Sequence, residues 1–322
     1  MSYRFQVGES ALEGVRRIAH EQLGRAIFSL GPASQGDEAI HEARKSLKRL
    51  RALVRLVRSE LGDEVYRRHN ECMRDAAREL AGLRDAAALQ EALDELLAWL
   101  GRRAPPSRFA AVADWLASRH ADHFKEDAER LERLTDNVRR RLQTLDADVD
   151  EWPHGNDGWQ ALSTGLRRVF VRGRKEYAEV LWRPTDEALH CWRKRVKYLR
   201  YHHQLLQPIW PEIMDAAIDQ ADELGELLGA DHDLALLALT SSSGYPRSGH
   251  ASTLYALRRR IAERRVELQT RCRVLGQRIY AERPKDFVRR LHGYWDSWSE
   301  EQIHPQAMFT QVLPFSQDST AE

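Results

Sequence analysis

The sequence has too few cysteines for a disulfide framework. Its three cysteines, Cys72, Cys191 and Cys272, are odd in number and far apart, and no Cys-x-x-Cys pair is present. Disulfide scaffolds and cysteine metal sites both need paired or closely spaced thiols. We therefore expect reduced, structural thiols, and we predict no metal and no other cofactor.

Long hydrophobic runs are also missing. The longest obvious run, Leu234 to Leu239, is far shorter than the roughly 20 residues that a membrane-spanning helix needs. The N-terminal segment MSYRFQVGES has no apolar signal region. Because 31% of the residues are charged and the mean hydropathy is −0.61, we predict a cytoplasmic protein without a membrane partner.

The chain has no excess of charge of one sign. Its 50 Lys and Arg residues nearly balance 49 Asp and Glu residues, which leaves a formal net charge of +1. A protein of this composition attracts an anion only if its positive charges are segregated on part of the surface. The positions of the basic residues therefore matter more than their number.

Apolar residues recur at helical spacing almost throughout the chain, and no segment shows convincing strand alternation. This periodicity predicts an all-α fold. Gly-Pro and Pro-rich segments separate the periodic stretches. The expected helices span approximately residues 9–30, 37–60, 63–100, 107–145, 159–182, 186–206, 211–239, 252–283 and 285–298.

The segment DADVDEWPHGND near the middle of the chain has turn chemistry and no periodicity, which indicates a boundary between two halves. Long helices with short connections are typical of antiparallel bundles. We therefore predict two pseudo-symmetric four-helix bundles. The expected divisions are 1–146 for the first half, 147–157 for the loop, 158–299 for the second half and 300–322 for a polar tail.

One motif occurs twice. DEAIHEARKSLKRLR at 37–51 returns as DEALHCWRKRVKYLR at 186–200, and both copies contain His-x-x-Arg-Lys-x-x-Lys-x-x-Arg. On a helix, this spacing gathers the basic residues in one arc roughly 120° wide beside an apolar arc. We call the basic arcs cationic ridges. The first contains His41, Arg44, Lys45, Lys48, Arg51 and Arg55, and the second His190, Arg193, Lys194, Lys197 and Arg200.

The apolar arcs beside the ridges are expected to pack into the bundles. They contain Ile40, Ala43, Leu47, Leu50, Val54 and Val57 in the first copy, and Leu189, Trp192, Val196 and Leu199 in the second.

Like charges three or four residues apart on a helix repel by a few tenths of a kcal/mol per pair. A ridge that costs stability and occurs twice indicates a compensating anion, although a solvated helix face is the alternative. The anion could also be internal, because 212–226 is acidic. Its carboxylates are Glu212, Asp215, Asp219, Asp222, Glu223 and Glu226. With reference pKa values near 6.5, His41 and His190 could add charge at mildly acidic pH or donate a hydrogen bond.

Two further groups are secondary candidates. ELAGLRDAAAL at 79–89 is echoed by ELLGADHDLALL at 226–237, so these segments could orient the ridges, or could be helix bends with locally satisfied polar groups. The helix expected at 159–182 carries cations at i, i+4 and i+7, which could extend the binding surface or form a solvated face. The secondary residues are Arg84, Asp85, His232, Asp233, Arg168, Arg172 and Lys175.

The duplicated motif, followed in each half by a Leu-rich segment with Arg-Asp or His-Asp, resembles the CHAD domain, the conserved histidine α-helical domain. The resemblance spans about residues 10–298. It implies two four-helix bundles related by a pseudo-twofold axis, a central basic cleft or pore lined by the motif helices, and binding of inorganic polyphosphate, often at polyphosphate granules. The ligand-facing set that it implies is His41, Arg44, Lys45, Lys48, Arg51, His190, Arg193, Lys194, Lys197 and Arg200. The ExExK signature of the CYTH domain, which many relatives carry, is not found.

Two other functions are alternatives. A metal-dependent phosphohydrolase is suggested by His232-Asp233, but cations surround both motif histidines and Arg84 stands where a ligand would be expected. A nucleic-acid-binding protein would fit basic helices, but no aromatic stacking platform follows the ridges. We therefore predict a non-enzymatic module whose partner is inorganic polyphosphate.

Overall fold

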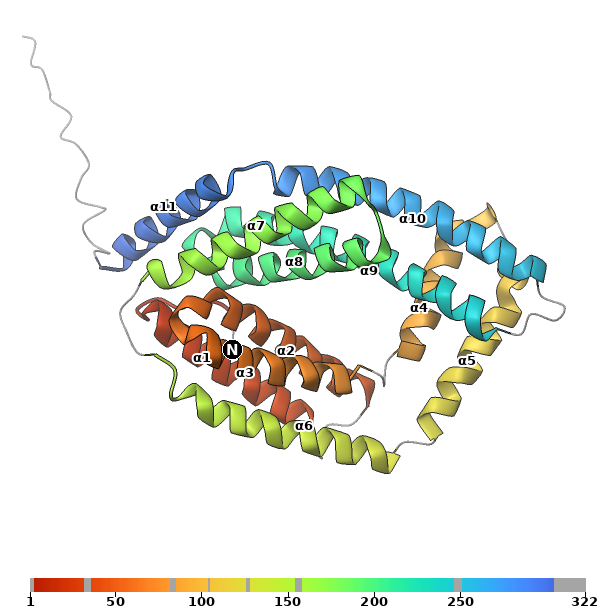
Figure 1. Cartoon of the computed structure of the whole chain (residues 1–322), viewed down its shortest axis with the longest axis horizontal. Coiled ribbons are helices and arrows are strands. Elements are labelled where there is room, and N and C mark those ends of the chain that lie inside the picture. Colours follow the sequence, from red (N-terminus) through yellow and green to blue (C-terminus); the bar gives the residue numbers. More distant parts are fainter. Residues whose placement is uncertain are drawn as a thin grey trace, which may run out of the picture.

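The fold consists of helices and their connections. A computed structural model of the chain describes residues 3–31, 36–81, 85–103, 105–125, 128–153, 158–245 and 251–303. These residues form eleven α-helices and three short 3-10 helices without any β-strand (Figure 1). The predicted all-α fold is confirmed. Within these ranges, no helix combines the length and the apolar character needed to cross a bilayer.

Two groups of helices lie side by side in the molecule (Figure 1). The N-terminal group contains α1 (Ala11–Ser29), α2 (Asp37–Leu56), α3 (Arg58–Glu79) and α6 (Ala128–Val149). The C-terminal group contains α7 (Gln160–Trp182), α8 (Asp186–Leu205), α9 (Pro211–Gly244), α10 (Ala251–Ile279) and α11 (Pro284–Ile303). The motif helices α2 and α8 contact each other where the groups meet.

The remaining two α-helices depart from the expected order. The helix expected at 63–100 is divided into the end of α3 and α4 (Asp85–Leu100), and the helix expected at 107–145 into α5 (Ala110–Lys125) and α6. Gly82, a poor helix former, lies between α3 and α4. The division lets α4 pack mainly against α9 and α5, at the end of the C-terminal group (Figure 1). Both α6 and α11 continue past the predicted division points at residues 146 and 299.

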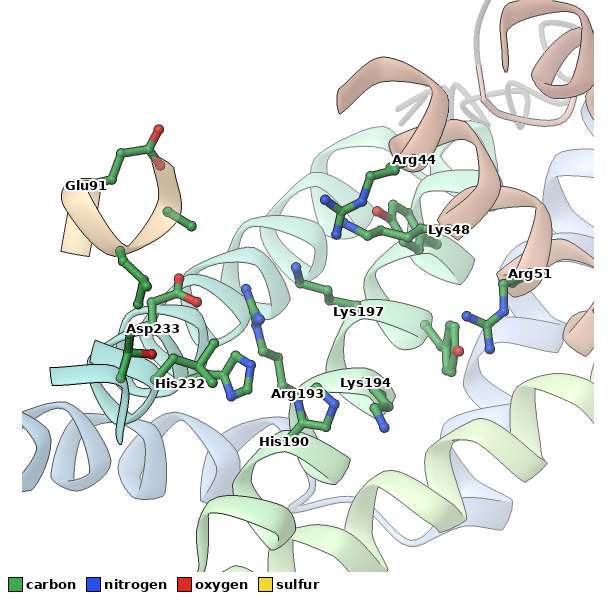
Figure 2. A pocket seen from close by; sticks show the side chains of 16 residues that line it. Arg44, Lys48, Arg51, Glu91, His190, Arg193, Lys194, Lys197, His232 and Asp233 are labelled. Atoms are coloured by element: carbon green, nitrogen blue, oxygen red, sulfur yellow. The ribbon is translucent and has the colours of Figure 1, made fainter. Parts of the chain in front are cut away.

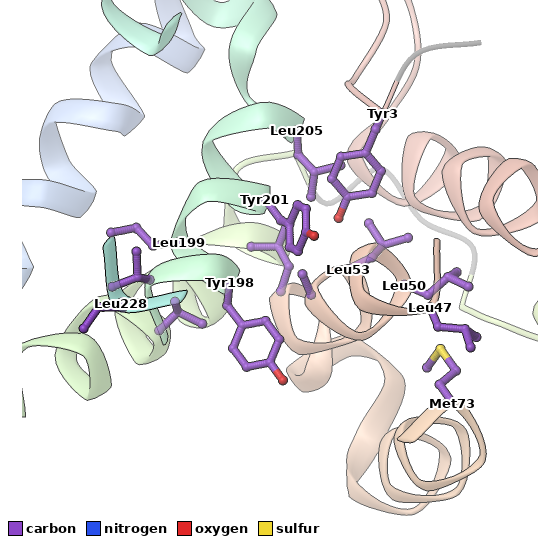
Figure 3. Close-up of a cluster of buried hydrophobic side chains, with 14 of the residues drawn as sticks. Tyr3, Leu47, Leu50, Leu53, Met73, Tyr198, Leu199, Tyr201, Leu205 and Leu228 are labelled. Atoms are coloured by element: carbon purple, nitrogen blue, oxygen red, sulfur yellow. The ribbon is translucent and has the colours of Figure 1, made fainter. Parts of the chain in front are cut away.

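The apolar arcs of both motif helices are buried, as their periodicity predicts. In the first copy, the six residues of the apolar arc, which end at the C-cap Val57 of α2, are at most 5% exposed. In α8, Leu189, Trp192, Val196 and Leu199 are at most 3% exposed. Figure 3 shows side chains of α2 and α8 meeting in one hydrophobic cluster. Burial of each large apolar side chain contributes about 1.5–3 kcal/mol, so the core holds both helices in place.

Close contacts at the end of α2 hold the two groups together. A Cβ atom at Gly165 of α7 would lie 1.8 Å from the carbonyl oxygen of Leu56, so only glycine permits this approach. His202 of α8 donates a hydrogen bond from Nε2 to the carbonyl oxygen of Ala52, at 2.9 Å. Burial lowers the pKa of His202 to about 4, so the ring stays neutral near pH 7. These contacts set the position of α8 relative to α2.

Candidate functional site

A cavity of about 610 Å³ lies between α2, α4, α8 and α9 (Figure 2). Six cations and two carboxylates line it, together with two histidines and two tyrosines. Figure 2 shows Asp233 and Glu91 on the side formed by α9 and α4, with Arg44 and Lys48 of α2 across from them. The lining residues are Arg44, Lys48, Arg51, Ala88, Leu89, Glu91, His190, Arg193, Lys194, Lys197, Tyr198, Tyr201, His232, Asp233, Leu236 and Thr240.

Helix α2 contributes three cations to this cavity. Arg44, Lys48 and Arg51 are at i, i+4 and i+7, which places them on one face of the helix. The Arg51 Nε donates a hydrogen bond to the side-chain oxygen of Asn70, 3.2 Å away on α3. The apolar arc on the adjoining face anchors the helix, so these three side chains project from a fixed backbone.

Helix α8 contributes the other three cations and His190. Its N-terminus is capped by Thr185, whose hydroxyl accepts a hydrogen bond from the Ala188 backbone N–H at 3.1 Å. Such a cap stabilises a helix by about 1 kcal/mol. Arg193, Lys194 and Lys197 therefore extend from a helix with a well-defined start (Figure 2).

Helix α9 packs closely against Arg193. A Cβ atom at Gly229 would lie 2.8 Å from the Nη2 of Arg193, so the missing side chain makes room for the guanidinium. Burial lowers the pKa of Arg193, and Asp233 acts against this shift. The guanidinium is thus a partly dehydrated cation fixed between α8 and α9.

Lys197 lies in the most crowded part of the positive charge. Burial, followed by Arg193, Lys48 and Arg200, lowers its pKa from 10.5 to about 7, although Asp233 acts in the opposite direction. Close to neutral pH, the ammonium is therefore protonated in only part of the molecules. An anion placed near its Nζ would favour the charged form.

The two cavity histidines are neutral near pH 7. The rings of His190 and His232 stack with their centres 4.7 Å apart. Burial, Lys194 and His232 lower the pKa of His190 to about 4. Burial and Arg193 also lower the pKa of His232. Neutral imidazoles can donate a hydrogen bond to an anion without adding charge.

A buried ion pair supports the α9 segment that carries His232 and Asp233. Asp231 is 1% exposed, and its carboxylate accepts hydrogen bonds from Arg265 at 2.9 Å and from Gln269 at 2.9 Å, both on α10. Arg265 also pairs with Asp186 at the start of α8. This network ties α8, α9 and α10 together behind the cavity.

Seven of the eleven primary candidates line the cavity, three from α2 and four from α8. The other four lie elsewhere. His41 is half-buried on α2, and Lys45 pairs with Glu42 at 3.0 Å. The guanidinium carbon of Arg55 lies 4.5 Å from the ring centre of Tyr198, and Arg200 pairs with Asp222 at 2.7 Å.

Some of the secondary candidates line the cavity, and others lie outside it. His232 and Asp233 line the cavity, whereas Arg168, Arg172 and Lys175 lie on α7 outside it. Arg84 is outside the described residues. Asp85 begins α4, but its side chain is outside the described part of the structure.

The acidic segment of α9 supplies one internal counter-anion to the ridges. Asp222 pairs with Arg200, while Glu223 pairs with Arg271 of α10 at 3.2 Å. The cavity carboxylate from this helix is instead Asp233, outside the acidic segment. The internal compensation expected as an alternative therefore applies to Arg200.

Sequence reasoning missed the two tyrosines in the wall. Tyr198 and Tyr201 follow ridge positions Lys197 and Arg200 in sequence, are 8% and 7% exposed, and line the cavity. Their three-residue spacing places them on one face of α8 and is the signal that could have found them. The wall also contains Glu91 and Thr240, which no repeat marked, and Leu236 from the echoed segment 226–237.

The arrangement of histidines and carboxylates bears on the metal-enzyme alternative. Among the described residues, no group of three or more His, Cys, Asp or Glu side chains is arranged to hold a metal ion. His190, His232 and Asp233 share their cavity with six cations, which disfavour a divalent cation electrostatically.

Comparisons of the sequence and of the fold with known proteins identify the family of the chain. No curated protein matches the chain in sequence. The fold is similar to a crystal structure of the CHAD domain from the plant Ricinus communis, with a TM-score of 0.55 and 16% identity, over 88% of this chain and 96% of that chain. The CHAD domain family model matches residues 18–240, a range that contains both motif helices and every residue of the cavity wall. The chain, with its duplicated histidine helices, belongs to the CHAD domain family.

Proposed function

We propose that this protein binds inorganic polyphosphate, or a closely similar polyanion, in the cavity between α2 and α8. The supporting observation is the concentration of six cations around one cavity in a chain whose net charge is only +1. Burial, and after it repulsion from Arg193 and Lys48, lowers the pKa of Lys197. A multivalent anion would relieve that repulsion.

The chemistry of the wall suits a chain of phosphates. Arginine offers planar, forked donors to phosphate oxygens, and lysine offers a compact point charge. Cations from α2 and α8 approach the cavity from different helices, so a ligand with many equivalent oxygens can contact both. A single orthophosphate, with about two negative charges at pH 7, carries too little charge to neutralise the six cations of the wall.

We propose a binding role without catalysis. The two cavity histidines are neutral at pH 7, and an anion would restore the proton of Lys197. The wall then presents mainly hydrogen-bond donors and fixed positive charges. Such a surface holds a polyanion and neutralises its charge.

The test is a titration of the purified protein with long-chain polyphosphate, duplex DNA and orthophosphate at several salt concentrations. Polyphosphate should bind most tightly. Its affinity should fall steeply as the salt concentration rises, because binding releases the salt cations that accompany the free polyphosphate. Weak binding without salt dependence, or a preference for DNA, would contradict the proposal.

The cavity itself is tested by Lys48→Glu combined with Lys197→Glu. This double variant should abolish polyphosphate binding while keeping the helical circular dichroism spectrum. Arg278→Glu combined with Lys285→Glu is a matched control, because it changes the net charge equally at exposed positions outside the cavity wall. Equal losses in both variants would indicate a general charge effect and place the site elsewhere.

A cellular role at polyphosphate granules follows from this proposal. A fluorescent fusion of the wild-type chain should gather at granules, and the Lys48→Glu, Lys197→Glu variant should remain dispersed. Granule binding by the variant would show that another surface directs it there.

A further inference from the structure

A second group of cations lies next to the cavity, where α2, α3, α7 and α8 meet. We call it the arginine cluster, and it contains Arg55, Arg58, Arg168, Arg172 and Arg195. Loss of hydration and then Arg195, Arg168 and Arg58 lower the pKa of Arg172. Burial, Arg51 and Arg195 lower the pKa of Arg55. Helix α7 packs against α2, α3 and α8, and α2 packs against both α3 and α8. The packing of these four helices therefore places the five arginine side chains in one region.

Tyrosine rings help to fix part of the arginine cluster. The guanidinium carbons of Arg58 and Arg55 lie 4.6 Å and 5.9 Å from the ring centre of Tyr66. Arg55 also lies 4.5 Å from the ring centre of Tyr198. Such cation–π contacts hold a guanidinium over the face of the ring.

The cluster has little internal counter-charge. Arg58 pairs with Asp63 at 2.8 Å, and Arg195 lies 3.7 Å from Glu176. Neither Arg168 nor Arg172 forms an ion pair with another residue in the described ranges, and the buried Nη1 of Arg168 has no hydrogen-bond partner there. Five guanidinium groups thus accompany two carboxylates.

Two residues connect the cavity to the arginine cluster. Arg51 lines the cavity, and its charge lowers the pKa of Arg55. Its backbone carbonyl oxygen also accepts a hydrogen bond from the Arg55 Nη1 at 2.7 Å. Tyr198 lines the cavity while its ring faces Arg55. Positive charge therefore continues along α2 from the cavity to Arg55, and α7 packs against the same helix.

We infer that the arginine cluster is a second contact surface for the polyanion, so that a chain longer than the cavity continues past Tyr198 to Arg168 and Arg172. This inference rests on the proposed function and adds a preference for long chains. Short chains contact the cavity, and long chains gain additional forked contacts with guanidinium groups. Arg168 and Arg172 then act in chain-length selection.

The experiment compares tripolyphosphate with long-chain polyphosphate, using the wild type and Arg168→Glu combined with Arg172→Glu. The variant should lose at least about tenfold in affinity for the long chain, since it removes two charge-assisted contacts and introduces two repelling carboxylates. Its affinity for tripolyphosphate should stay within about threefold of the wild type. Its salt dependence with the long chain should also become less steep.

Arg273→Glu combined with Arg278→Glu is the matched control, because both residues are exposed on α10 and belong to neither surface. Arg172→Gln alone changes one exposed side chain, so it carries little risk to folding. It should lose long-chain affinity too, by less than the double variant. The inference would be overturned if long-chain affinity were unchanged in the Arg168→Glu, Arg172→Glu variant and in Arg172→Gln. An equal loss of affinity for short and long chains would also overturn it. Failure of the wild type to bind either ligand would overturn the proposed function as well.

Discussion

The motif helices α2 and α8 carry the same basic pattern but contribute differently to the cavity. At the fifth shared position of the ridge, Arg51 lines the cavity, whereas its counterpart Arg200 pairs with Asp222. At the third, Lys194 lines the cavity, whereas its counterpart Lys45 pairs with Glu42. A repeated sequence thus supplies equivalent charges, and the neighbouring residues decide which of them face the cavity.

The surroundings of the two helices explain this difference. On α8, Arg193 fits against Gly229 of α9, and His190 stacks on His232 of the same helix. On the N-terminal side, α4 packs mainly against α9, away from the main group of α1, α2, α3 and α6 (Figure 1). Helix α8 is therefore enclosed by its own half, while the wall opposite it combines helices from the N-terminal half.

The largest effect is expected from the arginine pair. Arg51→Ala removes a cavity cation and should weaken long-chain polyphosphate binding by ten- to a hundredfold, which corresponds to a charge-assisted contact of about 1.5–3 kcal/mol. Arg200→Ala removes a residue already compensated by Asp222, so binding should change by less than about threefold. Calorimetric titration of both variants measures this difference. Equal losses of affinity in the two variants would show that position in the repeat, and not position in the cavity wall, determines how much each arginine contributes to binding.

A smaller effect is expected from pH, because the α8 copy places a lysine with a pKa of about 7 in the wall. Binding should require proton uptake by Lys197, so long-chain affinity should fall by about tenfold between pH 6 and pH 8. The groups around this lysine are Arg193, Lys48, Arg200 and Asp233. Titration in buffers with different ionisation enthalpies measures the uptake directly. Lys197→Arg keeps its charge over this range and should flatten the dependence.

The same residue makes a prediction for stability without ligand. Its folded pKa of about 7 is below the ordinary value of 10.5, so the unfolded chain binds more protons between these values. The free energy of unfolding should therefore rise with pH from about 7 towards 10.5, by at most about 1.4 kcal/mol per pH unit. Urea unfolding of the wild type and of Lys197→Met at several pH values measures this pH dependence of the free energy of unfolding. A rise that persists in the variant would assign the effect to other groups.

The smallest effect is expected from the lysine pair. Lys194 is exposed at the cavity edge, so Lys194→Ala should weaken binding by only a few-fold, in keeping with the about 0.2–1 kcal/mol typical of exposed charges. Lys45→Ala should leave affinity unchanged, because its ammonium pairs with Glu42 outside the wall. Titrations at low salt resolve this difference. A greater loss of affinity in Lys45→Ala than in Lys194→Ala would show that Lys45, and not Lys194, contacts the polyanion.

The sequence was sufficient to predict the helices and faces that depend on local spacing. Burial follows the helical period, so the apolar arcs from Ile40 to Val57 and from Leu189 to Leu199 could be identified from residue spacing alone. The two ridges were found because the same charges recur in the same order. Seven of the eleven ridge residues line one cavity.

What the sequence could not predict depends on packing between distant segments. The pairing of Arg200 with Asp222 and the fit of Arg193 against Gly229 require the placement of α9 on α8. The division of the helix expected at 63–100 into α3 and α4 places α4 beside α9. Tyr198 and Tyr201 have helical spacing but become part of a wall only when α2 and α8 meet.

The central claim is that a polyanion lies between the two motif helices. The most direct measurement is a crystal structure of the protein with tripolyphosphate, collected at low salt. The account predicts phosphate oxygens within hydrogen-bond distance, about 2.7–3.2 Å, of Lys48 on α2 and of both Arg193 and Lys197 on α8. Tripolyphosphate bound only at another surface, with the cavity between α2 and α8 left without phosphate, would contradict it.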